Sequence, residues 1–194
     1  KENFPEIEEI VPLNNQYFQF VAIDNANGKL FRKEDPDKIY ATVPDYFKIV
    51  PYQWLAGNKT TALSQPDEVV LTQSRAASYF GSLPPSEIVG RTLQYQDKPY
   101  VVKGVVADLD FPSSFDGKEF VSMPKADENP NWLSFNSNNK LFVKLEDNQK
   151  ERLLSALDEK YDAMVPEEWK NDDSSAQYHL LPLSEKHFSM DYAA

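Results

Sequence analysis

The sequence predicts an α+β fold made of two parts. Short runs in which apolar and polar residues alternate recur along the chain, and this pattern is typical of strands with one buried face. Two stretches, near 72–81 and 148–166, instead repeat their apolar residues at helical spacing. A polar, unpatterned segment at 58–68 separates the first part of the chain from the second, and we interpret it as a linker or a crossing between subdomains.

The N-terminal residues predict a strand followed by a hairpin. The run "FPEIEEIVPL" (4–13) is typical of a short acidic helix end that leads into a strand. Two strand-like runs then flank "DNANG" (24–28), so we expect a hairpin loop with Gly28 in a left-handed conformation. A calcium-binding loop is the alternative, but Ala26 stands where such a loop needs an oxygen ligand.

Residues 39–58 combine a strand with an aromatic-rich helix. The run "IYATV" (39–43) alternates as a strand, and "PDYFKIV" (44–50) is typical of a short helix with Pro44 in its first turn. Large apolar side chains then recur at roughly helical spacing, which is more typical of a core than of a ligand-binding site: Tyr46, Phe47, Val50, Trp54 and Leu55.

The stretch "VVLTQSRAASYFG" (69–81) predicts a strand that runs into a helix. Such a junction can hold a phosphate or an exposed nucleophile, and Ser74 and Arg75 stand there. A nucleophilic serine would need a glycine on either side, and a phosphate site would need small residues before the helix. A structural role fits better. Thr72 would be the N-cap, with its hydroxyl accepting from the backbone N–H of Ser74 or Arg75. Ala76 and Phe80 would lie on the inner face, and Gly81 would end the helix.

A β-meander is expected over 82–109, in "SLPPSEIVGRTLQYQDKPYVVKGVVADL". Here "RTLQYQ" alternates, "QDKP" predicts a turn, and "YVVKGVVADL" is typical of one long strand. Gly104 within that strand indicates a bulge or a close approach of another segment. One more strand is expected at "EFVSM" (119–123).

The C-terminal part predicts a β-α-β unit that must pack on a sheet. The run "LFVKL" (141–145) alternates as a strand, and "AQYHLLPL" (176–183) predicts a second one. Between them, Asn148 and Glu151 have the spacing of a capping box, and Pro166 ends the helical pattern. One face of this helix is apolar: Leu153, Leu154, Leu157, Tyr161 and Met164.

Composition limits the classes of function. The 194 residues carry 20 Lys and Arg against 31 Asp and Glu, a net charge of −11, and 41% of them are apolar. Such a chain folds around a core, and its charge repels phosphate backbones, so we expect no nucleic-acid partner. There is no cysteine, which excludes disulfides and thiolate sites. No apolar run approaches a membrane span of ~18 residues, and the two ends, without an initial Met, are typical of a domain excised from a longer protein.

No motif in the sequence predicts a catalytic, cofactor-binding or metal-binding residue, and we expect none. His179 and His187 have no partner whose spacing selects a metal. Ser122 and Lys125 match the Ser-x-x-Lys of penicillin-recognising enzymes, but Pro124 interrupts the helix that this motif needs. The chain has 6 glycines and no glycine-rich phosphate loop. Its carboxylate pairs stand in polar runs that are typical of a solvated surface.

Taken in order, these segments resemble the periplasmic core domain of MacB/FtsX-type ABC transporter permeases, and most closely the permeases of Bacteroidetes-type bacteria. Four stretches carry the resemblance: 40–58, 69–81, 88–115 and 141–161. The terminal "LPLSEKHFS" (181–189) is similar to the segment that leads back to the membrane in such proteins. Their order and spacing cover most of the chain. The departures are the segments 82–87 and 126–131, which fall in loops that vary within such domains.

The resemblance implies a two-lobed fold. A porter-like α/β lobe would be built from both chain ends, residues 1–58 and 130–194. A strand-rich mixed lobe, residues 59–129, would be inserted into it. The linker at 58–68 and the loops at 124–140 would bracket this insertion.

The resemblance also implies a function. The chain would be a non-catalytic periplasmic domain of an inner-membrane permease in a Gram-negative bacterium, and it would couple cytoplasmic ATP hydrolysis to export or other periplasmic work, a mechanism called mechanotransmission. Its partners would be an ABC ATPase subunit or domain, a second permease copy in a dimer, and a periplasmic adaptor, lipoprotein or peptide. No cofactor is implied. For an interaction surface we would expect exposed aromatics of the inserted lobe, such as Phe111 and Phe115.

Two other functions stay open from the sequence. A free-standing secreted module would use its aromatic-rich surface for ligand binding or adhesion, and an acidic periplasmic hydrolase would need an acid/base pair in a deep cleft. The parent gene separates the permease domain from the free-standing module. A permease domain requires one membrane helix before Lys1 and three after Ala194, with an ATPase gene nearby.

Overall fold

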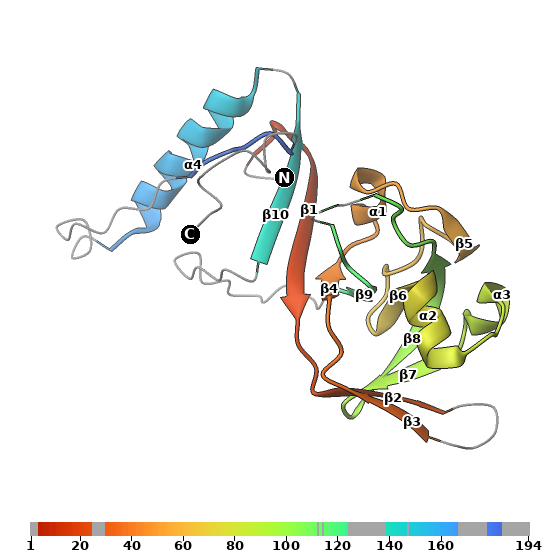
Figure 1. Ribbon diagram of the computed structural model, residues 1–194. Helices are drawn as coiled ribbons and strands as arrows, with labels where there is room; N and C mark the ends of the chain where they lie inside the picture. Colours follow the sequence, from red (N-terminus) through yellow and green to blue (C-terminus); the bar gives the residue numbers. More distant parts are fainter. Residues whose placement is uncertain are drawn as a thin grey trace. The chain divides into compact units, whose positions relative to one another are not determined.

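The computed structural model describes residues 4–24, 30–111, 113, 115–123, 139–146, 148–166 and 178–183. It has a mixed α/β fold with a curled sheet, and the chain divides into two compact units (Figure 1). Unit 1 comprises Lys1–Glu9, Asn131–Phe135 and Val143–Ala194, and unit 2 comprises Ile10–Pro130 and Asn136–Phe142. Two strands, β1 (Ile7–Gln16) and β10 (Asn139–Leu145), each pass from one unit to the other.

Unit 2 is built on a mixed sheet. Its strand order is β1-β4-β9-β6-β8-β7-β2-β3, with β5 paired to β8. β4 runs parallel to β9 and β6 runs parallel to β8, whereas β6 and β9 are antiparallel. Besides β1, the strands of this unit are β2 (Phe20–Asp24), β3 (Leu30–Glu34), β4 (Ile39–Thr42), β5 (Trp54–Gly57), β6 (Glu68–Thr72), β7 (Thr92–Tyr95), β8 (Lys98–Val106) and β9 (Glu119–Ser122).

Both predicted hairpins are present. β2 and β3 pair antiparallel, which confirms the hairpin around 24–28, although Gly28 and Ala26 lie outside the described residues. β7 and β8 pair antiparallel across the two-residue turn of Gln96 and Asp97, and Gln96 has a φ of 55°. A positive φ at this position matches the twist of the flanking strands. The predicted "QDKP" turn is therefore confirmed.

β6 is buried on both faces of the sheet, which explains its short apolar run. All five of its residues are buried. Val69 and Leu71 belong to one hydrophobic cluster and Val70 to the other, because successive side chains of a strand face opposite sides. A strand covered on both faces has a continuous apolar sequence rather than an alternating one.

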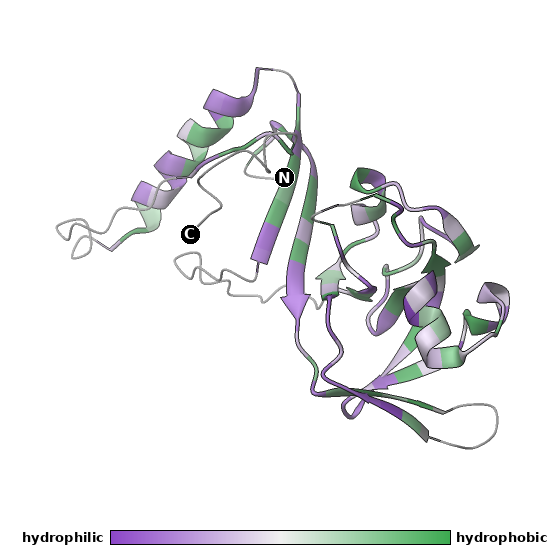
Figure 2. Cartoon of the chain, viewed as in Figure 1, coloured by the Kyte–Doolittle hydropathy of each residue, from purple (hydrophilic) through white to green (hydrophobic). Residues whose placement is uncertain are grey.

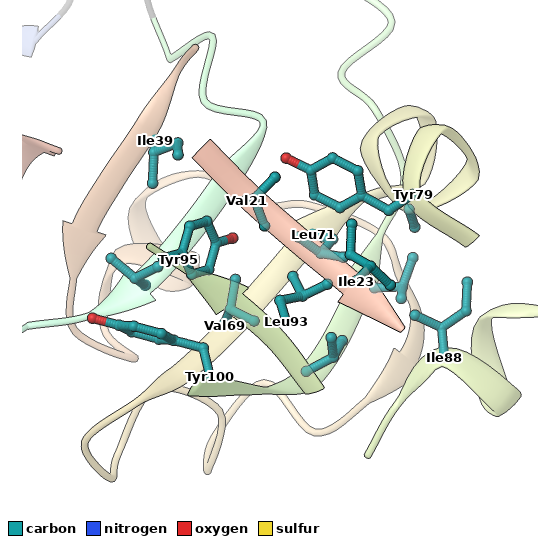
Figure 3. Close-up of a cluster of buried hydrophobic side chains, with 14 of the residues drawn as sticks. Val21, Ile23, Ile39, Val69, Leu71, Tyr79, Ile88, Leu93, Tyr95 and Tyr100 are labelled. Atoms are coloured by element: carbon teal, nitrogen blue, oxygen red, sulfur yellow. The ribbon is translucent and has the colours of Figure 1, made fainter. Parts of the chain in front are cut away.

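The first cluster packs the sheet against α2 (Gln73–Phe80) and α3 (Pro85–Ile88), and Figure 3 shows it in close-up. The helices contribute Ala76, Tyr79 and Ile88. Gly81 follows α2 with a φ of 66°, so the predicted end of this helix is confirmed. The strands supply the rest of the core, including Val21, Ile23, Ile39, Val69, Leu71, Leu93, Val102 and Val105.

The second cluster is aromatic and includes the helix α1 (Tyr46–Ile49). The ring of Phe120 lies 5.1 Å from that of Tyr46 and 5.5 Å from that of Phe47, measured between centroids. At such distances aromatic pairs stabilise a core beyond their buried area. The aromatic stripe of residues 46–55 is therefore core, as the sequence predicts, with Trp54 half-buried at its margin.

The segment 58–68 is not a plain linker. Ala62 and Leu63 are buried in the second cluster, with 2% and 4% of their surface exposed. The side chain of Asn58 accepts hydrogen bonds from the backbone N–H and the hydroxyl of Thr60, which closes a local turn. The polar composition of this segment concealed its two buried residues.

Gly104 lies where β5 and β8 approach each other closely. A Cβ atom at Gly104 would stand 2.3 Å from Cζ3 of Trp54, which is closer than real atoms approach. The register between β6 and β8 also shifts beside it, between Val69 and Val70. The close approach and the irregularity that the sequence predicts at Gly104 are therefore both present.

Unit 1 contains the long helix α4 (Lys150–Met164). Figure 2 shows hydrophilic and hydrophobic residues alternating along it. Pro166 follows the helix, as predicted. Of the predicted apolar face, Leu153 is buried and the other members are half-buried: Leu154, Leu157, Tyr161 and Met164.

Three local predictions for the two ends of the chain are wrong. Asn148 is not the N-cap of α4, because it adopts a φ of 67° in a turn and Gln149 takes the cap position without a side-chain hydrogen bond. Asparagine tolerates this left-handed conformation better than most residues. Residues 178–183 form no strand, and Pro182 among them has no N–H for a sheet ladder. Residues 5 and 6 form a turn before β1 and not a helix end.

The limits of the two units differ from those of the two expected lobes. β4, from the segment 1–58, pairs with β9 from the segment 59–129, and β2 likewise pairs with β7. Residues 10–58 thus share a sheet with the segment expected as an insertion, and the expected limit near residue 58 falls inside unit 2.

Candidate functional site

The candidate site is the junction at which β6 ends and α2 begins. Thr72 is the last residue of β6 and the N-cap of α2, with an extended backbone, as the sequence predicts. Its hydroxyl makes no capping bond to the helix backbone and instead lies 3.4 Å from Oγ of Ser74. The prediction that the Thr72 hydroxyl accepts a helix N–H is therefore wrong.

Asp108, from the segment after β8, supplies the cap in place of Thr72. The backbone N–H of Ser74 donates to Oδ2 of Asp108 at 2.7 Å, and the Ser74 hydroxyl donates to Oδ1 at 2.6 Å. Nζ of Lys118 donates to the same Oδ1 at 2.7 Å. A carboxylate at this place satisfies free N–H groups and interacts favourably with the helix dipole. Asp108 thereby connects the start of α2 with the end of β8 and with Lys118, the residue before β9.

Asp108 is poorly suited to activate Ser74 as a nucleophile. Partial burial acts to raise the pKa of Asp108, but the hydrogen bonds from Lys118 and Ser74 outweigh it and hold the pKa below its ordinary value. A carboxylate with a lowered pKa is a weak base near neutral pH, and a serine nucleophile needs a strong one. These contacts favour the structural role of Ser74 over the nucleophilic one.

Arg75 turns away from solvent and into the core. Its side chain is 5% exposed, and its Nε lies 3.1 Å from Oε1 of Glu119, whose side chain is fully buried. Its Nη2 donates at 2.8 Å both to Oδ1 of Asp37 and to the Asp37 carbonyl. Carboxylates and a carbonyl occupy Nε and Nη2, and Nη1 is buried without a partner among the described residues. Because the side chain is 5% exposed, these contacts favour a structural role for Arg75 over a phosphate site.

Glu119 is the centre of this buried network. The Tyr79 hydroxyl donates to Oε1 at 2.6 Å, and the Tyr95 hydroxyl donates to Oε2. Burial raises the pKa of Glu119, while the two hydroxyls and the charge of Arg75 oppose the rise. The network joins α2, β7 and β9, and Figure 3 shows the rings of Tyr79 and Tyr95 within the first cluster.

Tyr79 is the large buried residue of α2. It is 4% exposed, whereas Phe80 is half-buried and packs against the edge of the first cluster. Residues 75, 76 and 79 share the buried face because residues three and four apart lie above one another on a helix. The prediction of the inner face is therefore right for Ala76 and wrong in giving Phe80 the core position.

A comparison with known families decides what this fold is. The sequence model of the MacB-like periplasmic core domain matches residues 1–159, which is most of the chain. The chain belongs to this family. The resemblance inferred from the sequence is thus confirmed. No curated protein sequence matches this MacB-like domain.

Solved structures share the fold of this MacB-like domain at low sequence identity. A domain of a protein assigned as a permease from Porphyromonas gingivalis is 20% identical, with a TM-score of 0.61, and the match covers 84% of this chain and 73% of that one. The periplasmic region of MacB from Actinobacillus actinomycetemcomitans is 15% identical, with a TM-score of 0.53, and the match covers 89% of this chain and 79% of that one.

The two aromatics predicted for an interaction surface have different surroundings. Phe111 is 53% exposed. Phe115 is half-buried and packs against the second cluster, with its ring centroid 6.3 Å from that of Tyr46 and 5.5 Å from that of Phe142. Phe111 therefore presents its ring to solvent, while Phe115 contributes to the packing of the MacB-like domain. Their part in an interaction surface stays a prediction.

The other residues weighed for chemistry are dispersed. Ser122 is buried at the end of β9, where its Oγ accepts from the N–H of Glu68 at 3.2 Å, and Lys125 lies outside the described residues. His179 is exposed, and His187 also lies outside that part of the chain. Among the residues that the structure describes, no three His, Asp or Glu side chains are grouped to hold a metal ion. Across the same residues, no helix combines the length and the apolar character of a membrane span.

Sequence reasoning missed Glu119 and Asp108. A signal existed for Glu119, since it shares a strand face with Val121, a member of the first cluster, and a charge at such a position must be paired. No local signal distinguishes Asp108 from Asp110 two residues later, because only the fold brings Asp108 to the start of α2.

Proposed function

We propose that this MacB-like domain is the non-catalytic periplasmic part of an ABC transporter permease and that it couples cytoplasmic ATP hydrolysis to export or other periplasmic work. Membership of the family, with a match over residues 1–159, is the observation that carries the proposal. The similar solved structures, among them the periplasmic region of MacB, support the fold on which it rests.

The construction of unit 2 is compatible with mechanical coupling. An element that transmits movement must keep its shape while its attachments move, and close-packed interiors deform little. Unit 2 has a cluster on each side of β6, and the Glu119 network ties a helix to two strands by side-chain hydrogen bonds. Such a unit moves as a body, so a displacement applied at one end reaches the other.

The proposal includes the partners and the place of action. An ABC ATPase subunit or domain would supply the energy, a second permease copy would complete a dimer, and a periplasmic adaptor, lipoprotein or peptide would receive the movement. The parent would be an inner-membrane protein of a Gram-negative bacterium. Phe111, with its exposed ring, is the first residue to substitute in a search for the receiving surface.

The experiment uses the parent permease with its ATPase in membranes. Leu71→Ala removes a fully buried side chain at the centre of unit 2 and should cost about 2–5 kcal/mol of stability in this domain. The ATPase should still hydrolyse ATP, and the periplasmic work should be lost. Ser74→Ala is the matched control, since it removes one exposed hydroxyl from the same part of the fold, and it should leave the periplasmic work nearly unchanged.

Normal periplasmic work by Leu71→Ala, with the protein present in the membrane and its unit 2 shown to be unfolded by proteolysis, would contradict the proposal. Loss of ATP hydrolysis together with the work would point to a failure of assembly, and the abundance of the ATPase complex distinguishes that case.

A further inference from the structure

A polar pocket of about 210 Å³ lies within unit 1. It is formed by the residues at the start of β1 and by the connection between β10 and α4, whose elements Figure 1 labels. The lining residues are Pro5, Glu6, Glu8, Glu146, Gln149 and Arg152.

Glu6 is the buried acid of this pocket. Its side chain is 6% exposed, and its Oε1 accepts from Nε of Arg152 at 2.8 Å. Its second oxygen, Oε2, is buried and has no hydrogen-bond partner among the described residues. A carboxylate oxygen can only accept, and leaving it unpaired in a buried place is costly. Glu6 therefore brings an unsatisfied acceptor to the pocket lining, and a donor from outside the chain would satisfy it once the carboxylate turns toward the pocket.

Gln149 lines the same pocket and carries a second unsatisfied acceptor. Its Oε1 is buried and is likewise without a partner in the part of the chain that the structure describes. This residue is the N-cap of α4, so its backbone position is fixed by the helix. A molecule that satisfies both oxygens must carry at least two N–H or O–H donors.

The charges around the pocket select a cation. Three carboxylates and one guanidinium line it, and the guanidinium is already bound to Glu6. Glu8 has an ion pair at 2.5 Å with Lys144, whose side chain is 64% exposed. A bare metal is disfavoured, because the described residues contain no group of three acidic or histidine side chains placed to hold one. A primary ammonium group has three donors and a positive charge, and it fits both requirements.

We propose that this pocket binds a primary alkylammonium group. Two sources carry that chemistry in solution, a lysine side chain of a partner polypeptide and a small free polyamine. The site stands on the geometry of unit 1 alone, so it does not depend on the function proposed for the whole domain.

The test is a titration of the isotopically labelled 194-residue chain, followed by amide NMR. N-acetyl-lysine methylamide represents the polypeptide source, putrescine represents the polyamine, and potassium chloride at equal ionic strength is the salt control. We expect saturable shifts of the Gln149 side-chain amide and of the backbone amides near Glu6. The tighter of the two amines identifies the source.

Variants attribute the binding to the pocket. Glu6→Gln removes the charge but keeps the shape, and it should weaken binding roughly ten- to hundredfold. Glu159→Gln on the exposed side of α4 makes the same change in net charge and should alter binding by less than about twofold. If Glu6→Gln does not fold, Gln149→Met removes the second acceptor and should also weaken binding.

Three results would overturn the proposal. They are the absence of a saturable shift with either amine, equal shifts with potassium chloride, and unchanged affinity in a folded Glu6→Gln or Gln149→Met protein. Any of them would mean that the pocket does not bind an ammonium group. The permease assay of the coupling function would be unaffected, so the two proposals fail independently.

Discussion

At the residue scale, Glu119 and Arg75 depend on each other. Removing the charge of Glu119 leaves a guanidinium that is 5% exposed with its buried partner gone. We expect Glu119→Gln to lower the free energy of unfolding by about 3 kcal/mol, measured by urea denaturation. Glu87→Gln, an exposed substitution on α3, should change it by less than about 0.5 kcal/mol.

A double variant separates this pair from simple loss of packing. Glu119→Leu with Arg75→Met removes both charges, so it should be more stable than the Glu119→Leu single variant, which leaves the buried Arg75 with only the exposed Asp37 as an ion-pair partner. If the loss in the free energy of unfolding of the double variant equals the sum of the losses in the Glu119→Leu and Arg75→Met single variants, Glu119 and Arg75 do not interact as described.

Asp108 should make the stability of unit 2 depend on pH. Its pKa is lowered in the folded state, so the stability it provides is present above its unfolded pKa and is lost as the pH falls through the folded one. At pH 7, Asp108→Asn should cost about 1–2 kcal/mol through loss of the charged cap of α2. The difference in the free energy of unfolding between Asp108→Asn and the unsubstituted protein should then narrow as the pH falls below 3.8, the ordinary pKa of aspartate. Urea denaturation at a series of pH values measures this, and a difference that is constant with pH would contradict the assignment.

At the element scale, α2 is held by Tyr79 more than by Phe80. Tyr79 is 4% exposed and hydrogen-bonded to Glu119, whereas Phe80 is half-buried. Tyr79→Ala should therefore cost about 3–5 kcal/mol, and Phe80→Ala about half of that or less. Thermal unfolding of the two variants ranks them, and the reverse order would mean that α2 presents a different face to the sheet.

The contact of β5 with β8 requires glycine at position 104. Gly104→Ala would place a Cβ 2.3 Å from the Trp54 ring, so we expect a loss of about 1–3 kcal/mol in the free energy of unfolding. Trp54→Leu should by itself be destabilising, but it should restore part of the loss when it is combined with Gly104→Ala. A Gly104→Ala variant as stable as the unsubstituted protein would show that the strands can separate without cost.

At the scale of the whole molecule, the sequence predicts elements better than it predicts their pairing. The strands at 39–42, 68–72, 98–106 and 119–122 and the helices at 73–80 and 150–164 follow from periodicity, caps and turn residues. Their arrangement does not, because β4 meets β9 and β2 meets β7 across 70 or more residues, and no local pattern encodes such contacts.

The same distinction explains the candidate site. The N-cap position at Thr72 and the stop at Gly81 are local features, and the sequence reveals both. Asp108 and Glu119 reach α2 only through the fold. The strand pattern signals that Glu119 needs a partner but not which one, and nothing local marks Asp108. The resemblance to a family supplies what local patterns cannot, and the match over residues 1–159 confirms it.

The coupling of nucleotide state to movement of this domain is the central claim, and a distance measurement in the assembled permease tests it most directly. The chain has no cysteine, so Asp97→Cys in the exposed β7–β8 turn gives each copy one spin-label site within this domain. Other cysteines of the parent are replaced first. Pulsed electron resonance then compares the label-to-label distances in the nucleotide-free and ATP-trapped states. We predict two different distance distributions, and a single distribution once the ATPase can no longer bind ATP. Identical distributions in the nucleotide-free and ATP-trapped states of an active transporter would contradict the account.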